Sequence, residues 1–117
     1  MSISSAAGPL TWADFTKVDL RIGTIVAAEP FPEARNPSYR LRIDFGELGE
    51  RKSSAQITDL YRAEQLIGRQ VVAVVNFPPK QIATMMSECL VLGAVGEDKV
   101  VTLLQPERGV INGQRVG

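Results

Sequence analysis

Two arginines in one short alternating segment have the spacing that phosphate binding requires. Arg40 and Arg42 stand two positions apart and alternate with Tyr39, Leu41, Ile43 and Phe45, which are expected to face the core. Residues two apart on a β-strand project from the same face. Their guanidinium groups would therefore reach neighbouring phosphates of a nucleic-acid backbone, in a stripe that continues to Arg51 and Lys52. The alternative is a solvated strand face whose arginines form ion pairs with Asp44 and Glu50.

A second candidate site is the segment 77–86, which reads FPPKQIATMM. Prolines stiffen the backbone, and methionine side chains are flexible and polarisable, which suits surfaces that accept many partners. The combination predicts a shallow apolar groove for a peptide, although the same side chains would also serve as ordinary core contacts. The predicted peptide-binding residues are Phe77, Pro78, Pro79, Ile82, Met85 and Met86.

Polar residues flank this segment on both sides. Asn76 stands before the double proline, where a side-chain amide either ties the loop backbone or hydrogen-bonds a base edge. Ser87 and Glu88 precede the next predicted strand, where they either cap the turn or line the same mouth of a barrel. The predicted RNA-binding residues are Arg35, Arg40, Arg42, Lys52, Asn76, Lys80, Ser87 and Glu88.

The composition excludes most catalytic chemistry. The 117 residues include no histidine and one cysteine, Cys89, which removes Cys/His zinc sites and Ser-His or Cys-His nucleophiles. No glycine pattern resembles a phosphate-binding loop or a dinucleotide fingerprint. We therefore expect a binding protein that is not an enzyme and has no cofactor or metal. Thirteen basic and thirteen acidic residues give a net charge of zero, so RNA binding would require positive charge gathered on one face.

The elements that position these residues are mostly short strands, indicated by alternation or by apolar runs of strand length. The predicted strands are 18–28, 39–45, 51–57, 70–77, 89–94 and 100–104. Helical stretches are expected at 11–15 and at 59–67, the second ended by Gly68. The segment 78–88 is interpreted as a loop. This order favours an all-β fold with short helices, a five-stranded OB-fold Greek-key barrel, although other small barrels share the pattern.

Individual residues add detail to this fold. Gly23 inside the first strand is interpreted as a bulge or a bend, and Asn112-Gly113 as a turn near the end of the chain. Trp12 and Phe15 are expected to dock the first helical turn onto the barrel or across a dimer interface. Cys89 is expected to be a small buried apolar residue.

Several segments resemble the tRNA-binding domain family, whose members occur free-standing and fused to aminoacyl-tRNA synthetases. VDLRIGTIV at 18–26 is similar to the opening of that domain, NFPPK at 76–80 to its Asn-Leu-x-Pro-Arg segment, and SECL at 87–90 to its Ser-Glu-Gly-Met segment. The CsaA branch, described as export-related chaperones, is resembled most closely. The segments similar to that branch are FPEAR at 31–35, SSAQI at 53–57 and GRQVVAVVNFPP at 68–79.

The resemblance covers residues 12–117 and implies one OB-fold domain over 1–117 that forms a homodimer. It implies an N-terminal turn at about 10–17, a barrel core at about 18–95 and dimerisation strands at about 96–117. It also implies two ligands, the tRNA elbow and exposed segments of unfolded precursor proteins. RNA-binding relatives carry His-Pro-x-Ala-Asp where 31–35 reads FPEAR, and the CsaA branch often has a basic residue where Met86 stands. Both departures favour peptide over RNA.

The favoured hypothesis is an ATP-independent, chaperone-like homodimer that holds unfolded or export-bound polypeptides by their apolar and basic segments. The alternative is a tRNA-binding module that recognises structured RNA through backbone contacts. A cytoplasmic location is expected because one cysteine cannot form an internal disulfide and residues 1–9 lack the features of a signal peptide. No run approaches the ~20 apolar residues of a membrane span. The expected partners are therefore polypeptides, tRNA and the export machinery, without membrane insertion.

Overall fold

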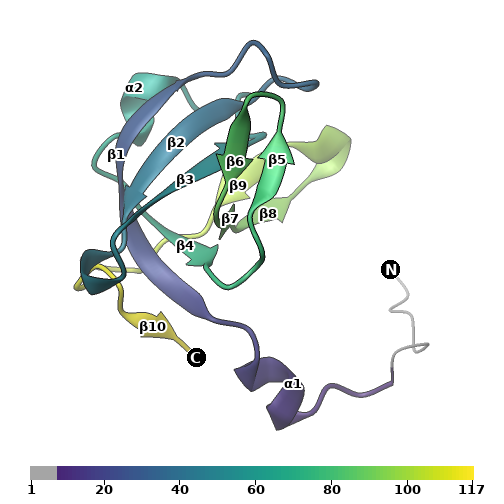
Figure 1. The fold of residues 1–117 in the computed structure, drawn as a ribbon, viewed down its shortest axis with the longest axis vertical. Helices are drawn as coiled ribbons and strands as arrows, with labels where there is room; N and C mark the ends of the chain where they lie inside the picture. The colour runs from purple at the N-terminus through teal and green to yellow at the C-terminus, as the bar shows by residue number, and fades with distance from the viewer. Residues whose placement is uncertain (1–7) are drawn as a thin grey trace.

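A long curved strand, β1 (Leu20–Pro30), organises the structure, a computed structural model that describes residues 8–117 (Figure 1). β1 pairs antiparallel with β2 (Tyr39–Asp44), β4 (Gln70–Val74) and β10 (Arg115–Val116). β3 (Glu50–Ala55) pairs with β2, and β7 (Leu90–Val91) pairs with β4, which gives the strand order β3–β2–β1–β4–β7. The sheet coils because β1 is long enough to pair with β4 near its start and with β2 near its end.

Two hairpins and a few short helices complete the fold. β5 (Lys80–Ile82) and β6 (Met85–Ser87) form one hairpin, and β8 (Gly93–Val95) and β9 (Val101–Leu103) form the other. β3 contacts both β6 and β7, which closes the sheet into a nearly complete antiparallel barrel. The helical elements are α1 (Trp12–Thr16), α2 (Ala63–Leu66) and 3-10 turns at Gly46–Leu48 and Glu97–Lys99. The predicted all-β barrel with short helices is confirmed.

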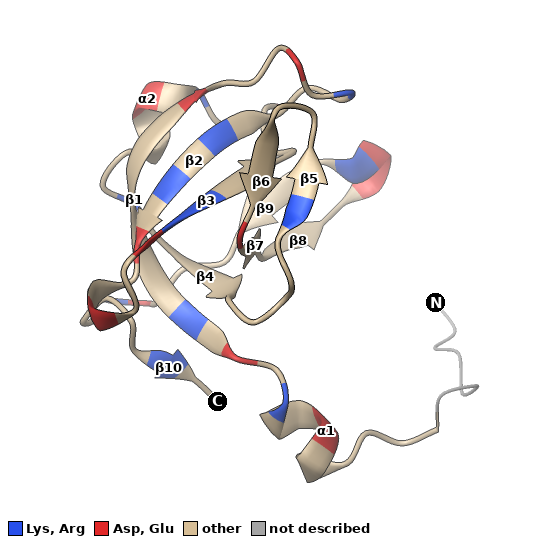
Figure 2. Cartoon of the chain, viewed as in Figure 1, with Lys and Arg blue, Asp and Glu red and all other residues tan. Residues whose placement is uncertain are grey.

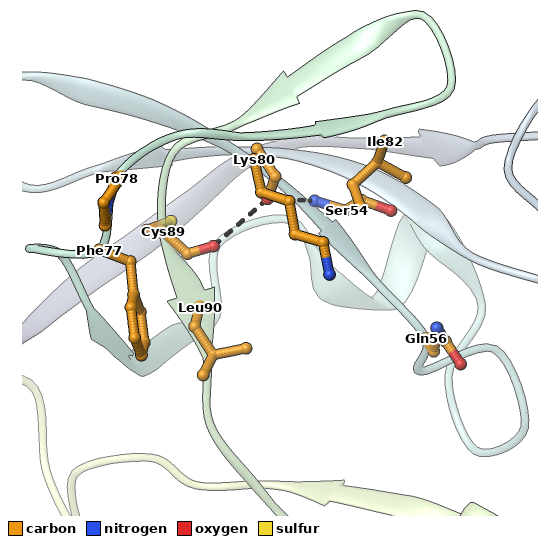
Figure 3. Close-up of a pocket in the computed structure, with 9 residues that line it drawn as sticks. Ser54, Gln56, Phe77, Pro78, Lys80, Ile82, Cys89 and Leu90 are labelled. Atoms are coloured by element: carbon orange, nitrogen blue, oxygen red, sulfur yellow. Dashed lines mark hydrogen bonds between the residues drawn. The ribbon is translucent and has the colours of Figure 1, made fainter.

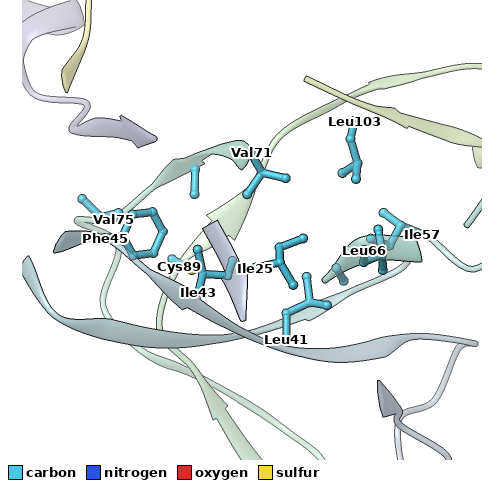
Figure 4. Packing of buried hydrophobic residues seen from close by; sticks show 12 residues of the cluster. Ile25, Leu41, Ile43, Phe45, Ile57, Leu66, Val71, Val75, Cys89 and Leu103 are labelled. Atoms are coloured by element: carbon cyan, nitrogen blue, oxygen red, sulfur yellow. The ribbon is translucent and has the colours of Figure 1, made fainter. Parts of the chain in front are cut away.

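The core follows from the alternation in β2. Leu41, Ile43 and Phe45 are completely buried, as predicted, and pack against Ile25 of β1 and Val71 of β4 inside the barrel (Figure 4). Each such side chain contributes roughly 1.5–3 kcal/mol by leaving water. The intervening arginines are thereby fixed on the outer face of the same strand.

The bulge in β1 lies at a different residue from the one predicted. The register between β1 and β2 shifts between Ile25 and Ala27, so Val26 is the extra residue. Gly23 is instead a site of close packing, because a Cβ atom there would lie 2.6 Å from Ile43 and 2.7 Å from Phe45. A larger residue at position 23 would therefore displace the core.

Two predicted segments have a different secondary structure. The helix expected at 59–67 is reduced to the single turn α2, which ends before Gly68 at φ +90°. The loop expected at 78–88 is wrong, because these residues contain the β5–β6 hairpin. Its turn contains Ala83 at φ +50°, a left-handed conformation that L-residues other than Gly and Asn rarely adopt.

The first helical turn forms as predicted but does not pack on the barrel. The Thr11 hydroxyl accepts a hydrogen bond from the backbone N–H of Asp14 at 3.1 Å, which caps α1. The helix has no buried residue and Trp12 is 84% exposed, so docking onto the chain's own barrel is wrong (Figure 1). Docking across a dimer interface stays a prediction.

Asn112 adds side-chain hydrogen bonds to the pairing of β10 with β1 that holds the C-terminal residues to the barrel. Asn112 Oδ1 accepts hydrogen bonds from Thr24 Oγ1 at 2.7 Å and from Gln70 Nε2 at 3.0 Å. The predicted turn at Asn112-Gly113 is confirmed, and Gly113 adopts φ +90° there. The dimerisation role expected for 96–117, which include β9 and β10, stays a prediction.

The prediction that residues 1–9 are not a signal peptide concerns mainly residues 1–7, which lie outside the described part of the chain. Within residues 8–117, no helix is long and apolar enough to cross a membrane.

Candidate functional site

The β5–β6 hairpin contributes residues to two grooves on the barrel surface. The first, here called the apolar groove, has a volume of about 400 Å³ and is lined by Ser54, Gln56, Phe77, Pro78, Lys80, Ile82, Ser87, Cys89 and Leu90 (Figure 3). The second, the arginine groove, has a volume of about 410 Å³ and is lined by Ala27, Glu29, Arg40, Leu41, Arg42, Lys52, Thr84, Met85 and Met86. Both volumes lie in the range of about 300–1,000 Å³ that is typical of ligand sites.

The apolar groove combines a hydrophobic end with a polar one. Phe77 and Leu90 are 56% and 48% exposed, although their side chains are large and apolar. Figure 3 shows these two at one end of the groove, Gln56 at the other and the Lys80 side chain between them. Pro78, directly after Phe77, fixes the backbone that presents the aromatic ring. The groove therefore offers apolar surface beside a positive charge.

The floor of the apolar groove is held rigidly by hydrogen bonds. Ser87 Oγ accepts from the backbone N–H of Ser54 at 3.3 Å and donates to the carbonyl of Cys89 at 3.4 Å (Figure 3). Ser53 Oγ donates to the same carbonyl at 3.0 Å. Burial raises the pKa of the Cys89 thiol to about 11, against a smaller opposing effect of the hydrogen bond with Ser53. The thiol is therefore neutral and unreactive at physiological pH, in keeping with the apolar role expected for it.

Glu88 joins the end of the hairpin to β3. Its backbone N–H donates to the Lys52 carbonyl at 2.8 Å, and its Oε1 accepts from the Lys52 N–H at 3.0 Å. Ser87 and Glu88 thus bond backbone groups of β3, more than thirty positions away, rather than capping the local turn. Ser87 also lines the apolar groove, and a binding role for the two residues stays a prediction. These hydrogen bonds join the hairpin to β3 and help to close the barrel where β3 has no ladder of backbone pairs with the hairpin.

Asn76 ties two distant parts of the backbone together. Its Nδ2 donates to the Lys17 carbonyl at 2.6 Å, and its Oδ1 accepts from the Asp19 N–H at 3.0 Å. Both ends of the amide are therefore engaged between α1 and the start of β1. Asn76 lines neither groove.

The arginine stripe is largely neutralised. Arg40 forms ion pairs with Glu29 at 3.0 Å and with Glu33 at 3.9 Å, and Arg42 pairs with Glu50 at 3.0 Å. Figure 2 shows the basic bands on β2 with acidic residues on the neighbouring strands. The cross-strand ion pairs that the sequence left open as an alternative are present, although Arg40 uses acids other than Asp44.

Free cations remain next to these pairs. Lys52 lies directly opposite Arg42 in the β2–β3 register. Among residues 8–117, Lys52, Lys80 and Arg35 have no carboxylate within 4 Å. Lys80 lines the apolar groove, Lys52 lines the arginine groove, and Arg35 is exposed in the loop after β1.

The two predicted residue sets are mixed in space. Of the predicted peptide-binding residues, Phe77, Pro78 and Ile82 line the apolar groove, Met85 and Met86 line the arginine groove, and Pro79 lines neither. Met85 is buried, whereas Met86 is 44% exposed.

Four residues that line the apolar groove were not predicted from the sequence as binding residues: Ser54, Gln56, Cys89 and Leu90. Ser54 and Gln56 continue the outward-facing period of two that begins at Lys52, alternating with buried Ser53, Ala55 and Ile57. That alternation was a usable signal. Leu90 carried no such signal, because a sequence does not show whether a leucine in a strand has neighbours to pack against. Among residues 8–117 there is no cluster of His, Cys, Asp or Glu suited to a metal.

Comparison with known proteins identifies the family. The family model of the tRNA binding domain matches residues 20–115. The crystal structure of the CsaA chaperone from Bacillus anthracis has a TM-score of 0.90 and 55% sequence identity, covering 94% of this chain and all of the other. The CsaA chaperone protein from Picrophilus torridus has a TM-score of 0.86 and 47% identity, covering 93% of this chain and all of the other.

The chain belongs to the CsaA-type branch of the tRNA-binding domain family.

The predicted OB-fold barrel is thereby confirmed. The chain is also similar to the methionine–tRNA ligase of Bdellovibrio bacteriovorus, with 41% identity over 107 residues, which are 92% of this chain and 15% of the ligase. Several other curated methionine–tRNA ligases match in the same way, and the chain spans 14–17% of their length. The match is therefore to an accessory domain of those enzymes, and CsaA-type proteins share that domain as a binding module.

Proposed function

We propose that this CsaA-type chain is an ATP-independent holder of unfolded polypeptides that binds apolar segments in the apolar groove. The observation that carries the proposal is the exposure of Phe77 and Leu90 in one groove of about 400 Å³. Exposed apolar side chains gathered in a concave surface are typical of binding sites rather than of solvated surface. The two similar solved structures named chaperones support the same class of ligand.

The charge distribution supports polypeptide over RNA as the main ligand. The two arginines that would contact phosphates are already paired with Glu29 and Glu50, and each pair would have to be broken or shared to bind RNA. The Asn76 amide, the candidate for a base edge, is engaged by backbone groups at both ends.

Binding of tRNA is the second candidate, favoured by the family of the chain and by the unpaired Lys52 beside Arg42 on the outer face of β2 and β3. In this alternative the arginine groove contacts the phosphate backbone of structured RNA, and the exposed Arg35 and Lys80 add positive charge outside it. Such binding would weaken steeply with salt, because each neutralised phosphate releases counterions.

We also propose that the chain works as a homodimer in the cytoplasm, with precursor proteins bound for export among its clients. Leu10 and Trp12 at the N-terminal end, and Val95 and Ile111 in the later part of the chain, are large apolar side chains more than two-thirds exposed. A second copy is the simplest partner to cover them, and pairing would present two apolar grooves to one client. Sedimentation tests the pairing, with an expected mass twice the 12.7 kDa of one chain. A monomer at micromolar concentration would contradict it.

The proposed cytoplasmic location rests on a different observation. A single, free and buried cysteine is in keeping with a reducing compartment.

Fluorescence anisotropy distinguishes the two ligands. A labelled unstructured peptide rich in apolar residues and labelled bulk tRNA are each titrated with the protein at ~50 and ~200 mM salt, where polyanion binding changes most. The proposal predicts that the peptide binds with little salt dependence and that tRNA binds weakly. Tight, salt-sensitive tRNA binding without peptide binding would overturn it.

A further inference from the structure

We propose that the apolar groove selects segments in which an apolar side chain stands close to a carboxylate, with Lys80 as the partner of that carboxylate. This inference rests on the proposed function, since it concerns which polypeptide segments the groove prefers. It departs from the apolar and basic segments expected from the sequence, and the charges in and around the groove are the reason.

Lys80 is the one charged residue among those that line the apolar groove. Its side chain extends between the apolar end, formed by Phe77 and Leu90, and the polar end at Gln56 (Figure 3). Within residues 8–117 no carboxylate lies within 4 Å of its ammonium group. Its charge is therefore available to a ligand, and a carboxylate there would gain a charge-assisted hydrogen bond.

No acid is among the residues that line the apolar groove. Glu88, beside Ser87, is outside the lining, and its Oε1 accepts a hydrogen bond from the Lys52 backbone N–H. A basic ligand side chain in the apolar groove would thus meet Lys80 with no acid among the lining residues to offset the repulsion.

The adjoining arginine groove offers one unpaired cation. Of the three bases that line it, Arg40 and Arg42 are paired with Glu29 and Glu50, whereas Lys52 has no carboxylate within 4 Å among residues 8–117. An acidic segment that leaves the apolar groove past the hairpin would therefore meet a second free ammonium group at Lys52, and a basic segment would not.

The apolar end supplies the second half of the specificity. Phe77, Pro78 and Leu90 form a surface that takes an aliphatic or aromatic side chain through dispersion and loss of water. The charge of Lys80 then distinguishes segments that are equally apolar. Specificity of this kind is a difference between two affinities, and repulsion of the wrong segment contributes as much to it as attraction of the right one.

The test uses three labelled peptides of equal length and equal apolar content, in which the residues beside each leucine are Glu, Gln or Lys. Each is titrated by anisotropy against the full chain and against Lys80→Gln and Lys80→Glu. Lys17→Glu is the matched control, because Lys17 is also exposed but lines neither groove. Lys17→Glu changes the net charge of the chain by the same amount as Lys80→Glu.

The wild-type chain is expected to bind the Glu peptide about five- to tenfold more tightly than the Lys peptide, the range expected for one partly enclosed ion pair and its repulsive counterpart. Lys80→Gln is expected to remove most of that preference and Lys80→Glu to reverse it, while Lys17→Glu leaves it unchanged. Equal binding of all three peptides, tighter binding of the Lys peptide, or an unaltered preference in Lys80→Glu would overturn the inference and leave the proposed function standing. Failure of every peptide to bind would overturn both.

Discussion

Replacing Phe77 with Ala is the substitution that most directly removes apolar surface from the groove. A phenylalanine side chain presents about 150–250 Å², and 56% of Phe77 is exposed, so about 80–140 Å² is available to a ligand. At about 25 cal/mol per Å², complete coverage of that area would be worth about 2–3.5 kcal/mol. Because the groove is open on its solvent side, coverage of about half that area is realistic, and the expected loss is about 1–2 kcal/mol.

This loss corresponds to a fall in peptide affinity of about 5- to 30-fold. It is measured by anisotropy with the same labelled, unstructured apolar peptide for the wild-type chain and for Phe77→Ala. Stability is expected to change by less than about 1 kcal/mol, because the ring is mostly outside the core. Thermal unfolding followed by circular dichroism checks that the variant is folded.

Leu60→Ala is the matched control. Leu60 is 52% exposed, nearly as much as Phe77, but it lies before α2 and lines neither groove. Its replacement is expected to leave peptide affinity within about twofold of the wild-type value, as is usual for substitutions outside an interface. An affinity for Phe77→Ala within the same range, or an equal loss in both variants, would refute the assignment of the groove.

Three further experiments test other parts of the structure. Replacing Arg40 and Arg42 with Ser is expected to lower tRNA affinity by less than about threefold in a filter-binding assay, because both guanidinium groups are ion-paired, and Lys52→Ser is expected to cost at least as much. A tenfold loss in the double variant would show that the stripe binds RNA. Burial raises the pKa of Cys89 to about 11. As pH rises above the ordinary pKa of a thiol, Cys89 therefore ionises in the unfolded chain before it ionises in the folded one. The free energy of unfolding should then be unaffected below pH ~8 and fall by about 2 kcal/mol by pH ~10.5 relative to Cys89→Ala. If urea denaturation gives the same difference in unfolding free energy between the wild-type chain and Cys89→Ala at both pH values, the thiol is not buried. Asn112→Ala leaves the Thr24 hydroxyl without its acceptor and removes one of the two acceptors of Gln70 Nε2, and is expected to destabilise the chain by about 1–2 kcal/mol in the same assay. A change below about 0.5 kcal/mol would mean that the C-terminal residues are not held by this contact.

The sequence predicted best the features that depend on local alternation. The period of two in β2 identifies Leu41, Ile43 and Phe45 as core residues and places Arg40 and Arg42 on the outer face. Neutralisation of the arginines was harder to foresee. Glu29 and Glu33 reach Arg40 only through the pairing of β1 with β2 and the course of the following loop, which no local pattern encodes.

The β5–β6 hairpin was missed because its sequence lacks the usual signals. Each strand has three residues, too few to display alternation, and two prolines precede the first. The turn contains Ala83 in a left-handed conformation rather than Gly or Asn, so the turn residues that identify hairpins are absent. The hairpin forms because Ser87 and Glu88 attach it to β3, a contact between residues more than thirty positions apart.

The composition of the two grooves follows from that long-range contact. With the hairpin placed beside β3, Lys80 joins Phe77 and Leu90, whereas Met86 joins Arg42 and Lys52. The sequence identified most of these side chains as binding residues but grouped them by chemical type and by proximity along the chain. Their actual grouping depends on which face of a folded hairpin each one lines.

Nuclear magnetic resonance of the isotope-labelled full chain, titrated with the unstructured apolar peptide, tests the central claim most directly. Binding in the apolar groove predicts that the backbone resonances of Ser54, Gln56, Phe77, Lys80 and Leu90 shift with a common dissociation constant, while those of Arg40 and Arg42 change little. Shifts confined to the arginine groove, or an absence of shifts at peptide concentrations that saturate the anisotropy signal, would contradict the claim that the apolar groove is where this chain holds polypeptides.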